Sequence, residues 1–469
     1  MTSDVNSPAA SRWRPLLASC LGTFLLLLYT SIVSVALPQI GADLHAGFSA
    51  CAWIMDVFSL TLAGLLLGMG SLSDNLGRKR VYLAGLAAFT LATAGCGLAG
   101  SAALLIAARA AQGVAAAAMF ATILPLIALT YSGRDRARAF AVYGAVAGSS
   151  SAIGAVTGGM LSQYLGWRWI FLGSLPICLA TIWISCVALA ETPRAHHRVD
   201  YLGVTTFTIT AGAATYAVIR AGEAGWASPG TLMALAAAGA SFLIFGWRQR
   251  RGDHPVLPAA MFSTRRFAGV LLAAFSYYLA AFSGQPVLSI WLQVEARLSP
   301  TATGLVLASQ VGVFFVTSLA VSGRLHDVPA GRVLGGGSVL VGVGCLSALV
   351  VSGWTAWPAV LPALLITGAA AGAVSPVLPA VAIGSVPPAY GGTAGAAANG
   401  SRQLGLTMGI ALCATAYARS GGGSAGLVSA FGLCAAVALV GGALAMWLLR
   451  TRCQPVGSTG EISATESAP

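Results

Sequence analysis

Charged residues are scarce in this chain of 469 residues: Asp, Glu, Lys and Arg together make up 8% of it, and Lys79 is the single lysine. Soluble globular domains carry about 25% charged residues, so this composition excludes a water-exposed surface of that size. Apolar types make up 57% of the chain, which also excludes intrinsic disorder. A mean hydropathy of +0.82 therefore predicts an all-α polytopic membrane protein with little mass outside the bilayer.

Sequence features that would carry other functions are also missing. There is no GxxxxGK[ST] phosphate-binding loop and no CxxC pair. The five histidines fall in loops, and almost all of the nine cysteines lie within apolar runs as small core residues. We therefore expect that the protein is not an enzyme and has no catalytic residues. We also expect that it holds no metal or cofactor and does not use ATP directly. A channel is disfavoured because no filter-like sequence is present.

Fourteen apolar runs are long enough to cross a bilayer, and polar or turn-rich residues separate each run from the next. The first run is longer than the apolar region of a signal peptide, so we read it as an uncleaved span. The predicted spans are 16–38, 53–71, 81–99, 102–130, 139–161, 167–190, 203–221, 231–247, 267–292, 300–323, 333–351, 357–383, 392–417 and 427–450.

The basic residues predict the orientation of these spans. With the N-terminus inside, 19 of the 25 basic residues fall on the cytoplasmic side and four fall outside, as the positive-inside rule requires. We therefore expect the tails 1–14 and 451–469 to be cytoplasmic. We expect the protein itself to lie in the cytoplasmic (inner) membrane of a bacterial cell. The net charge of +12 then reflects topology and gives no reason to expect nucleic-acid binding. The expected partners are a small-molecule substrate, protons and the lipid bilayer, and we expect a monomer.

The loop after the second span recurs after the tenth. The pattern Gly-x-Leu-x-Asp begins at Gly70 and again at Gly323, and the basic residue that follows, Lys79, recurs at the same offset as Arg332. Parallel repeats of this kind are a feature of transporters, with the substrate site between the halves. We therefore predict two six-helix bundles, over residues 15–195 and 265–450. An inserted helix pair with a cytoplasmic linker, over residues 196–264, joins them.

The first copy of this loop has a chemistry of its own. It reads Gly70-Ser71-Leu72-Ser73-Asp74-Asn75-Leu76-Gly77-Arg78-Lys79-Arg80. Gly70 and Gly77 permit a tight reversal between packed helices, and Asp74 can pair with Arg78 or with a helix N-terminus. We predict a latch that acts between the conformational states of a transporter. A determinant of folding and topology is the competing interpretation, and both can hold.

Further short motifs accompany this loop. They are Leu28-Tyr29-Thr30-Ser31-Ile32-Val33-Ser34-Val35-Ala36-Leu37-Pro38 in span one, Trp53-Ile54-Met55-Asp56-Val57-Phe58 in span two, Ala108-Arg109-Ala110-Ala111-Gln112-Gly113 in span four, Gly154-Ala155 with Gly158-Gly159 in span five, Trp167-Arg168-Trp169-Ile170-Phe171 in span six and Ser401-Arg402-Gln403-Leu404-Gly405 in span thirteen. On these residues the sequence resembles the major facilitator superfamily over about residues 15 to 450. More narrowly, it resembles the fourteen-span drug:proton antiporter branch of that superfamily.

This resemblance implies export of small amphiphilic, drug-like molecules in exchange for protons by alternating access. It also implies that Arg109 belongs to a proton-relay motif and that Gly154, Gly158 and Gly159 form the antiporter motif. Two positions depart from the pattern, because Tyr29 stands where the branch usually has an acid and Ala155 where it usually has proline. The competing function is proton-coupled transport of a metabolite that is not a drug.

Apart from arginines in the last two residues at a span end, three charged groups lie within predicted spans: Asp56, Arg109 and Arg402. A charge at the bilayer centre costs at least about 2.5–3.5 kcal/mol, so such residues are usually functional. We predict that Asp56 and Arg109 share a cavity in the outer half of the membrane and couple transport to protons. Each group also has a structural alternative. Asp56 can be a hydrated carboxylate at the membrane interface, Arg109 can donate hydrogen bonds to several helix carbonyls, and Arg402 can serve only in helix packing. The candidates for the substrate cavity are Tyr29, Gln112, Asn399, Arg402 and Gln403.

The predicted topology can be tested with reporter fusions. Fusions after Arg198 and Arg452 should report a cytoplasmic location, and a fusion after Arg168 should report an outside location, because the basic residues separate in that way. Paired alkaline phosphatase and green fluorescent protein reporters measure both outcomes. Termini on opposite sides of the membrane would contradict the even number of spans.

Overall fold

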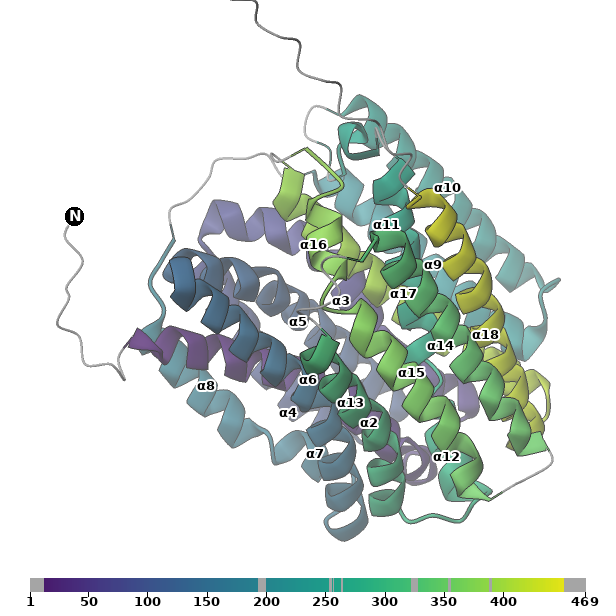
Figure 1. The fold of residues 1–469 in the computed structure, drawn as a ribbon. Coiled ribbons are helices and arrows are strands. Elements are labelled where there is room, and N and C mark those ends of the chain that lie inside the picture. Colours follow the sequence, from purple (N-terminus) through teal and green to yellow (C-terminus); the bar gives the residue numbers. More distant parts are fainter. Residues whose placement is uncertain are drawn as a thin grey trace, which may run out of the picture.

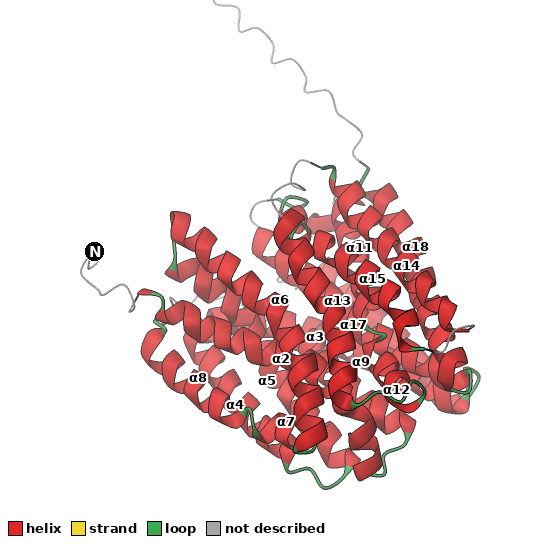
Figure 2. Ribbon diagram, turned by 60° about the horizontal axis from the view of Figure 1, so that its bottom comes forward, coloured by secondary structure: helices red, strands yellow, loops and turns green. Residues whose placement is uncertain are grey.

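The computed structural model describes residues 12–192, 200–252, 255, 257–262, 265–321, 328–352, 356–387 and 390–450. Helices dominate these residues, and none of the described segments is a strand (Figure 2). The long helices are α2 (Arg14–Asp43), α3 (Phe48–Leu76), α4 (Arg78–Gly97), α5 (Ala102–Thr130), α6 (Gly133–Tyr164), α8 (Leu175–Ala188), α9 (Tyr201–Ala224), α10 (Pro229–Arg251), α11 (Arg265–Phe282), α12 (Gln285–Val294), α13 (Pro300–Val321), α14 (Gly336–Ser347), α15 (Leu361–Val374), α17 (Gly391–Arg419) and α18 (Gly423–Leu448). The shorter pieces are α7 (Trp169–Leu172) and α16 (Leu378–Ile383).

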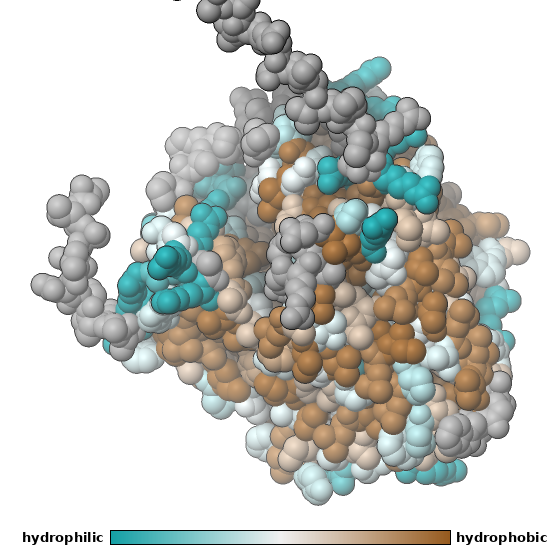
Figure 3. Space-filling model, viewed as in Figure 1, coloured by the Kyte–Doolittle hydropathy of each residue, from teal (hydrophilic) through white to brown (hydrophobic). Residues whose placement is uncertain are grey.

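The surface of the helices suits a bilayer. Large apolar side chains face outward at mid-helix, such as Leu91, Trp183 and Leu243, each of which is at least 70% exposed. Figure 3 shows apolar residues over the side of the molecule, with hydrophilic residues gathered mainly at its ends. Such a distribution is unfavourable in water and favourable in lipid. The chain is therefore a multi-pass membrane protein.

Each of the fourteen predicted spans coincides with a helical stretch, but the count of membrane crossings stays a prediction. Twelve stretches of the described chain are both long enough and apolar enough to cross a membrane. The stretches outside this set are α4 and α17. The first begins with three basic residues, and the second is rich in Gly and Ala and contains Arg402.

Proline interrupts several of the spans, as expected from its missing amide hydrogen. The sixth span breaks between α7 and α8, where Pro176 occupies the first turn of α8. The ninth breaks between α11 and α12, with Pro286 in the first turn of α12. In the twelfth span, α15 ends just before Pro376, and Pro379 lies in the first turn of α16.

The helices form two units with the same pattern of packing. In the first, α2 packs on α6, α3 on α5 and α4 on α5, and in the second, α11 packs on α17, α13 on α15 and α14 on α15. Each pairing in one unit has its counterpart in the other, as the repeated loop predicts. The two units lie side by side in Figure 1.

The inserted pair packs against both units. Helix α9 lies on α10, on α3 of the first unit and on α17 of the second. The Thr208 hydroxyl donates to the carbonyl of Gly64 at 3.0 Å, and the Thr415 hydroxyl donates to the carbonyl of Val218 at 2.9 Å. The pair therefore adds a side wall to the bundle where α3 meets α17.

The three glycines of the span-five motif allow close helix contact. A Cβ atom added to Gly154 would lie 2.6 Å from the Ser31 hydroxyl, and one added to Gly158 would lie 2.7 Å from the Ile32 carbonyl oxygen. Both contacts join α6 to α2. Any side chain at these positions would push the two helices apart, so glycine sets their spacing.

The same motif joins the two units of the molecule. A Cβ atom on Gly159 would clash with the carbonyl of Pro300, and one on Gly304 would clash with the carbonyl of Ala155. Pro300 and Gly304 belong to α13 in the second unit, whereas Gly159 and Ala155 belong to α6 in the first. Ala155, which replaces the expected proline, is thus buried at the contact between the units.

We expect Gly158→Ala to lower the free energy of unfolding by about 1–3 kcal/mol, because overpacking forces backbone shifts. Transport should fall as well, since α6 would shift on α2. Gly144→Ala is the matched control on the same helix, because a Cβ atom there would meet nothing within 4 Å. Thermal unfolding in detergent measures both variants. Equal unfolding temperatures for the two would refute this account of the motif.

Candidate functional site

Arg109 is the centre of a buried polar cluster in the first unit. Its side chain is 1% exposed. Its Nε donates to the carbonyl of Ile54 at 3.2 Å, and its Nη1 donates to Gln112 Oε1 at 2.8 Å. Gln112 in turn donates to the Thr93 hydroxyl at 2.7 Å. The guanidinium also lies 4.3 Å from the ring centroid of Phe58, so it binds α5 to α3 and α4.

Asp56 lies on α3 and is completely buried, with 0% exposure. Neither carboxylate oxygen has a hydrogen-bond partner among the described residues. The titratable side chain that lies near it is Cys413, on α17 of the second unit. Asp56 therefore stands at the contact between the two units, and water does not surround it as it would surround an interfacial carboxylate.

The structure does not pair Asp56 with Arg109, the two groups that we expected to share a cavity. Among the described residues, no ion pair joins them. Arg109 contacts Ile54 and Phe58, which are one turn apart on α3. Asp56 follows Ile54 by two residues, which turns it about 200° around the helix axis. Asp56 and the residues that Arg109 contacts therefore lie on opposite faces of α3, and only the tertiary structure could show which neighbour each face has.

Tyr29 and Gln112, two of the candidates for the substrate cavity, lie inside the first unit. The Tyr29 hydroxyl donates to the carbonyl of Ile170 at 3.1 Å and lies 2.5 Å from the Ser174 hydroxyl. Its ring is fully buried and stacks on Phe171. Gln112 is fully buried and has its polar atoms paired with Arg109 and Thr93. Both side chains contribute to helix packing in this state.

The other candidates share α17. Arg402 lies 4.6 Å from the ring centroid of Tyr278, and its Nε is buried without a hydrogen-bond partner. Gln403 is 4% exposed, and its Oε1 also lacks a partner. Asn399 is partly buried. These three residues cover about one turn of the same helix, and Arg402 and Gln403 differ from Tyr29 and Gln112 in having buried polar atoms without a partner.

The loop motif anchors the first unit at its predicted cytoplasmic end. Arg78 binds the Asp74 carboxylate, with Nε and Nη2 lying 3.0 and 2.9 Å from Oδ1. The Arg78 amide donates to the Thr192 hydroxyl at 3.1 Å, and Lys79 donates to the carbonyl of Cys186 at 3.0 Å.

Gly77 has a φ of +99° and faces the Glu191 carboxylate, so a side chain there would be strained and crowded. A Cβ atom on Gly70 would meet nothing within 4 Å, so the structure gives no packing reason for that glycine. The second copy of the loop, at 323–327, lies outside the described residues.

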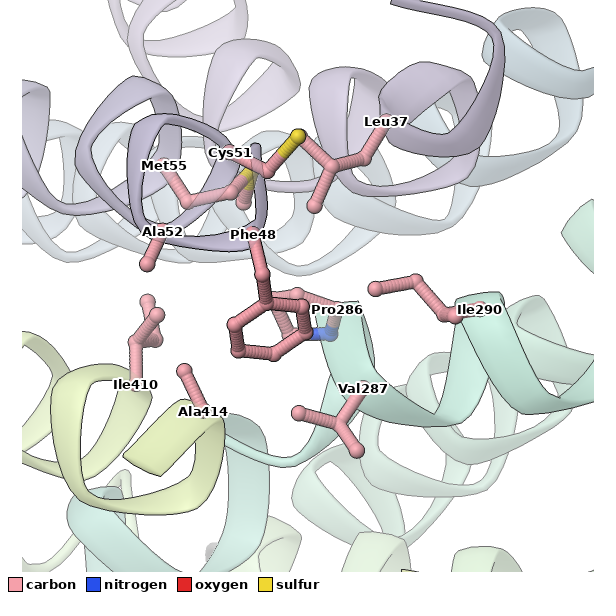
Figure 4. A pocket seen from close by; sticks show the side chains of 10 residues that line it. All are labelled: Leu37, Phe48, Cys51, Ala52, Met55, Pro286, Val287, Ile290, Ile410 and Ala414. Carbon is pink, nitrogen blue, oxygen red and sulfur yellow. The ribbon is translucent and has the colours of Figure 1, made fainter. Parts of the chain in front are cut away.

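A small apolar pocket lies where the units meet, between α2, α3, α12 and α17. Figure 4 shows Phe48 of α3 reaching toward Pro286 and Val287 of α12. The Phe48 ring also stacks on Tyr417 of α17, with the centroids 5.9 Å apart. No side chain in the pocket is charged, so it suits apolar parts of a ligand. The lining residues are Leu37, Phe48, Cys51, Ala52, Met55, Pro286, Val287, Ile290, Ile410 and Ala414.

Sequence reasoning missed a partly buried ion pair in the inserted helices. Asp200 caps α9 by accepting from the Gly203 amide at 3.0 Å, and the same oxygen accepts from Arg248 Nε at 2.9 Å. The Asp200 side chain is 1% exposed. An acid immediately before a predicted helix is a capping signal, but the partner 48 residues away follows only from the packing of α9 on α10.

Comparison with known proteins agrees with this fold. The family model of the Major Facilitator Superfamily matches residues 19–252 and 270–466. The methylenomycin A resistance protein of Bacillus subtilis (strain 168) is 32% identical over 420 residues, covering 87% of this chain and 89% of that protein. The puromycin resistance protein pur8 of Streptomyces alboniger is 30% identical, covering 98% of this chain and 96% of that protein.

Solved structures support the fold. The crystal structure of the peptide transporter POT in complex with sulfate superposes with a TM-score of 0.72 at 13% identity, covering 95% of each chain. The human organic anion transporter MFSD10 gives a TM-score of 0.61 at 18% identity, covering 95% of this chain and 100% of that chain. The two repeated helical units, the family match over most of the chain and these likenesses lead to one conclusion: the chain belongs to the Major Facilitator Superfamily and is a transporter, not an enzyme.

Proposed function

We propose that this protein exports small amphiphilic, drug-like molecules across the bacterial cytoplasmic membrane in exchange for protons. The names of its relatives support drug export, since they include resistance proteins for methylenomycin A and puromycin and the multidrug resistance protein Stp of Mycobacterium tuberculosis. We further propose that both termini are cytoplasmic and that the protein acts as a monomer. Alternating access between the two units carries the substrate.

The contacts between the units support alternating access. Two hydrogen bonds join described residues of the two units, from Gln293 to the carbonyl of Val35 at 2.9 Å and from the Thr301 amide to Gln163 at 3.2 Å. The predicted topology places these residues near the outer ends of their helices. The apolar pocket around Phe48 belongs to the same region. We therefore assign this structure to a state that is closed on the outside.

Proton coupling rests on one observation: Asp56 is fully buried, lacks any hydrogen-bond partner within the described chain and lies between the units. An ionised carboxylate without a partner is strongly disfavoured in such a place. The neutral carboxyl fits this state, and it can release its proton once movement of α3 relative to α17 admits water. Arg109 is then a positioning residue, because its bond to the Ile54 carbonyl holds the turn of α3 that carries Asp56.

We expect Asp56→Asn to bind substrate but to lose uphill efflux, because the amide keeps the shape of the carboxyl and cannot exchange a proton. Efflux driven by a pH gradient in everted vesicles should fall by about 100-fold or more, within the range measured for removing an essential proton-transfer group. Binding to the purified variant should change by less than about 3-fold, which is under 1 kcal/mol.

Glu223→Gln is the matched control for this experiment. Glu223 is a carboxylate near the end of α9 that is 45% exposed and pairs with Arg220. Its neutralisation should leave uphill efflux intact. Coupling through Asp56 is refuted by an Asp56→Asn protein that still concentrates substrate with the pH dependence of the wild type.

The loop motif is the second part of this proposal. Arg78 holds Asp74 while its backbone and its neighbour Lys79 bind the segment that follows α8 and the end of α8 itself. This network ties the end of α3 to the end of the sixth span. We propose that it latches these helix ends in one conformational state and releases them in the other.

Asp74→Asn should lower transport by about 2- to 5-fold, because the neutral amide loses the charge of its partly exposed pair with Arg78, and such pairs are worth about 0.2–1 kcal/mol. The amount of protein in the membrane should stay near that of the wild type. Asp74→Glu should retain more transport than Asp74→Asn. Normal transport by Asp74→Asn would leave the motif with a role in topology alone.

A further inference from the structure

Arg402 carries a positive charge that the fold does not neutralise. It lies near the middle of α17, and the ion pairs between described residues join other groups. Its Nε is buried and has no hydrogen-bond partner. Arginine stays protonated in proteins, so this position holds a permanent cation where an unpaired charge is costly.

The groups around Arg402 are aromatic and neutral. Its guanidinium lies 4.6 Å from the ring centroid of Tyr278. The titratable side chains close to it are Tyr277, Tyr278 and Tyr143. Phenols have an unperturbed pKa of about 10 and carry no charge at neutral pH. A cation–π contact stabilises a cation by about 0.5–2 kcal/mol, which compensates only part of the cost of burying the charge.

This cluster lies between the two units. Tyr143 belongs to α6 of the first unit, whereas Tyr278 and Arg402 belong to α11 and α17 of the second. Tyr278 and Phe282 also pack against the apolar core of the first unit. In Figure 1, α6 lies in one half of the bundle, and α11 and α17 lie in the other.

The cluster combines flat apolar surface with unpaired polar atoms. The rings of Tyr277, Tyr278, Phe282 and Phe314 follow one another with centroid distances of 5.5, 4.9 and 6.0 Å. Arg402, Asn399 and Tyr278 are only partly buried, so part of each side chain stays accessible. Beside Arg402, Gln403 Oε1 lacks a partner.

We propose that Arg402 and this aromatic chain form a binding site for substrates that carry an acidic group next to an aromatic ring. Arg402 pairs with the acidic group, and the faces of Tyr278 and Phe282 hold the ring. A cationic substrate is disfavoured here because it would face the unpaired guanidinium. This assignment names the substrate class of the proposed exporter and rests on that function.

The test is a binding measurement without any gradient, so it does not depend on proton coupling. The full-length protein in phosphatidylcholine nanodiscs is titrated calorimetrically at pH 7 with naphthalene-1-acetate and, separately, with naphthalene-1-acetamide. The two probes share ring and shape and differ in charge. Wild-type protein should bind the acid about 10-fold more tightly or better, as expected for a charge-assisted bond in a desolvated site.

Arg402→Gln should bind both probes equally, with the affinity for the amide unchanged, and Arg402→Lys should keep part of the preference for the acid. Arg419→Gln is the matched control on the same helix, since Arg419 donates to the carbonyl of Ala221 away from this cluster. It should keep the full preference. Tyr278→Leu should weaken the binding of both probes, which tests the aromatic half of the site if Arg402→Gln does not fold.

Three outcomes would overturn the assignment. One is a wild-type protein that shows no preference for the acid or no saturable binding of it at millimolar concentration. Another is an Arg402→Gln protein that retains the preference. The third is loss of acid binding by the wild type when phosphatidylglycerol is added to the nanodiscs, because a lipid headgroup would then be the natural occupant of the site. Failure of uphill efflux in Asp56→Asn is a separate result and leaves these outcomes unaffected.

Discussion

Close approach of helix backbones through glycine is the constraint on which the rest of this structure depends. Gly154 and Gly158 set α6 against α2, and Gly159 with Gly304 sets α6 against α13 across the two units. The second unit uses the same device, because a Cβ atom on Gly405 would clash with the carbonyl of Phe275 where α17 meets α11. Lipid gives helices no hydrophobic reason to associate, so close packing has to supply the attraction.

The few charges inside the bundle follow from that close packing. Arg109 is compatible with a buried site because carbonyl, amide and aromatic groups surround it. Asp56 has no hydrogen-bond partner among the described residues, and Arg402 has the Tyr278 ring beside it but no acidic partner there; both lie where helices of different units meet. A stable core would have paired these groups or replaced them with apolar side chains. Ionisable groups without a partner at the boundary between the two units are better explained by ligands, protons or water than by stability.

In the proposed mechanism Asp56 exchanges the proton and Arg402 binds the substrate. Asp56 faces α17 near Cys413, whereas Arg402 lies on α17 beside Tyr278. The two positions on α17 are eleven residues apart, or about 16 Å along the helix. Protons and substrate can therefore act on the same helix at different depths, and α17 is the element that both would move. This arrangement allows coupling without direct contact between proton and substrate.

The sequence by itself determined the class of protein, the approximate positions of the fourteen apolar helical stretches and the two-unit repeat, because hydrophobic length and a repeated loop are local or additive signals. It also identified Asp56, Arg109 and Arg402 as unusual, since charge within an apolar run is visible without a fold. Only the tertiary structure decided their partners. Asp56 points away from the face of α3 that Arg109 contacts, and Tyr29 turns into the first unit toward Ser174. The reason is that the neighbour on each face of a helix depends on packing between segments far apart in the chain.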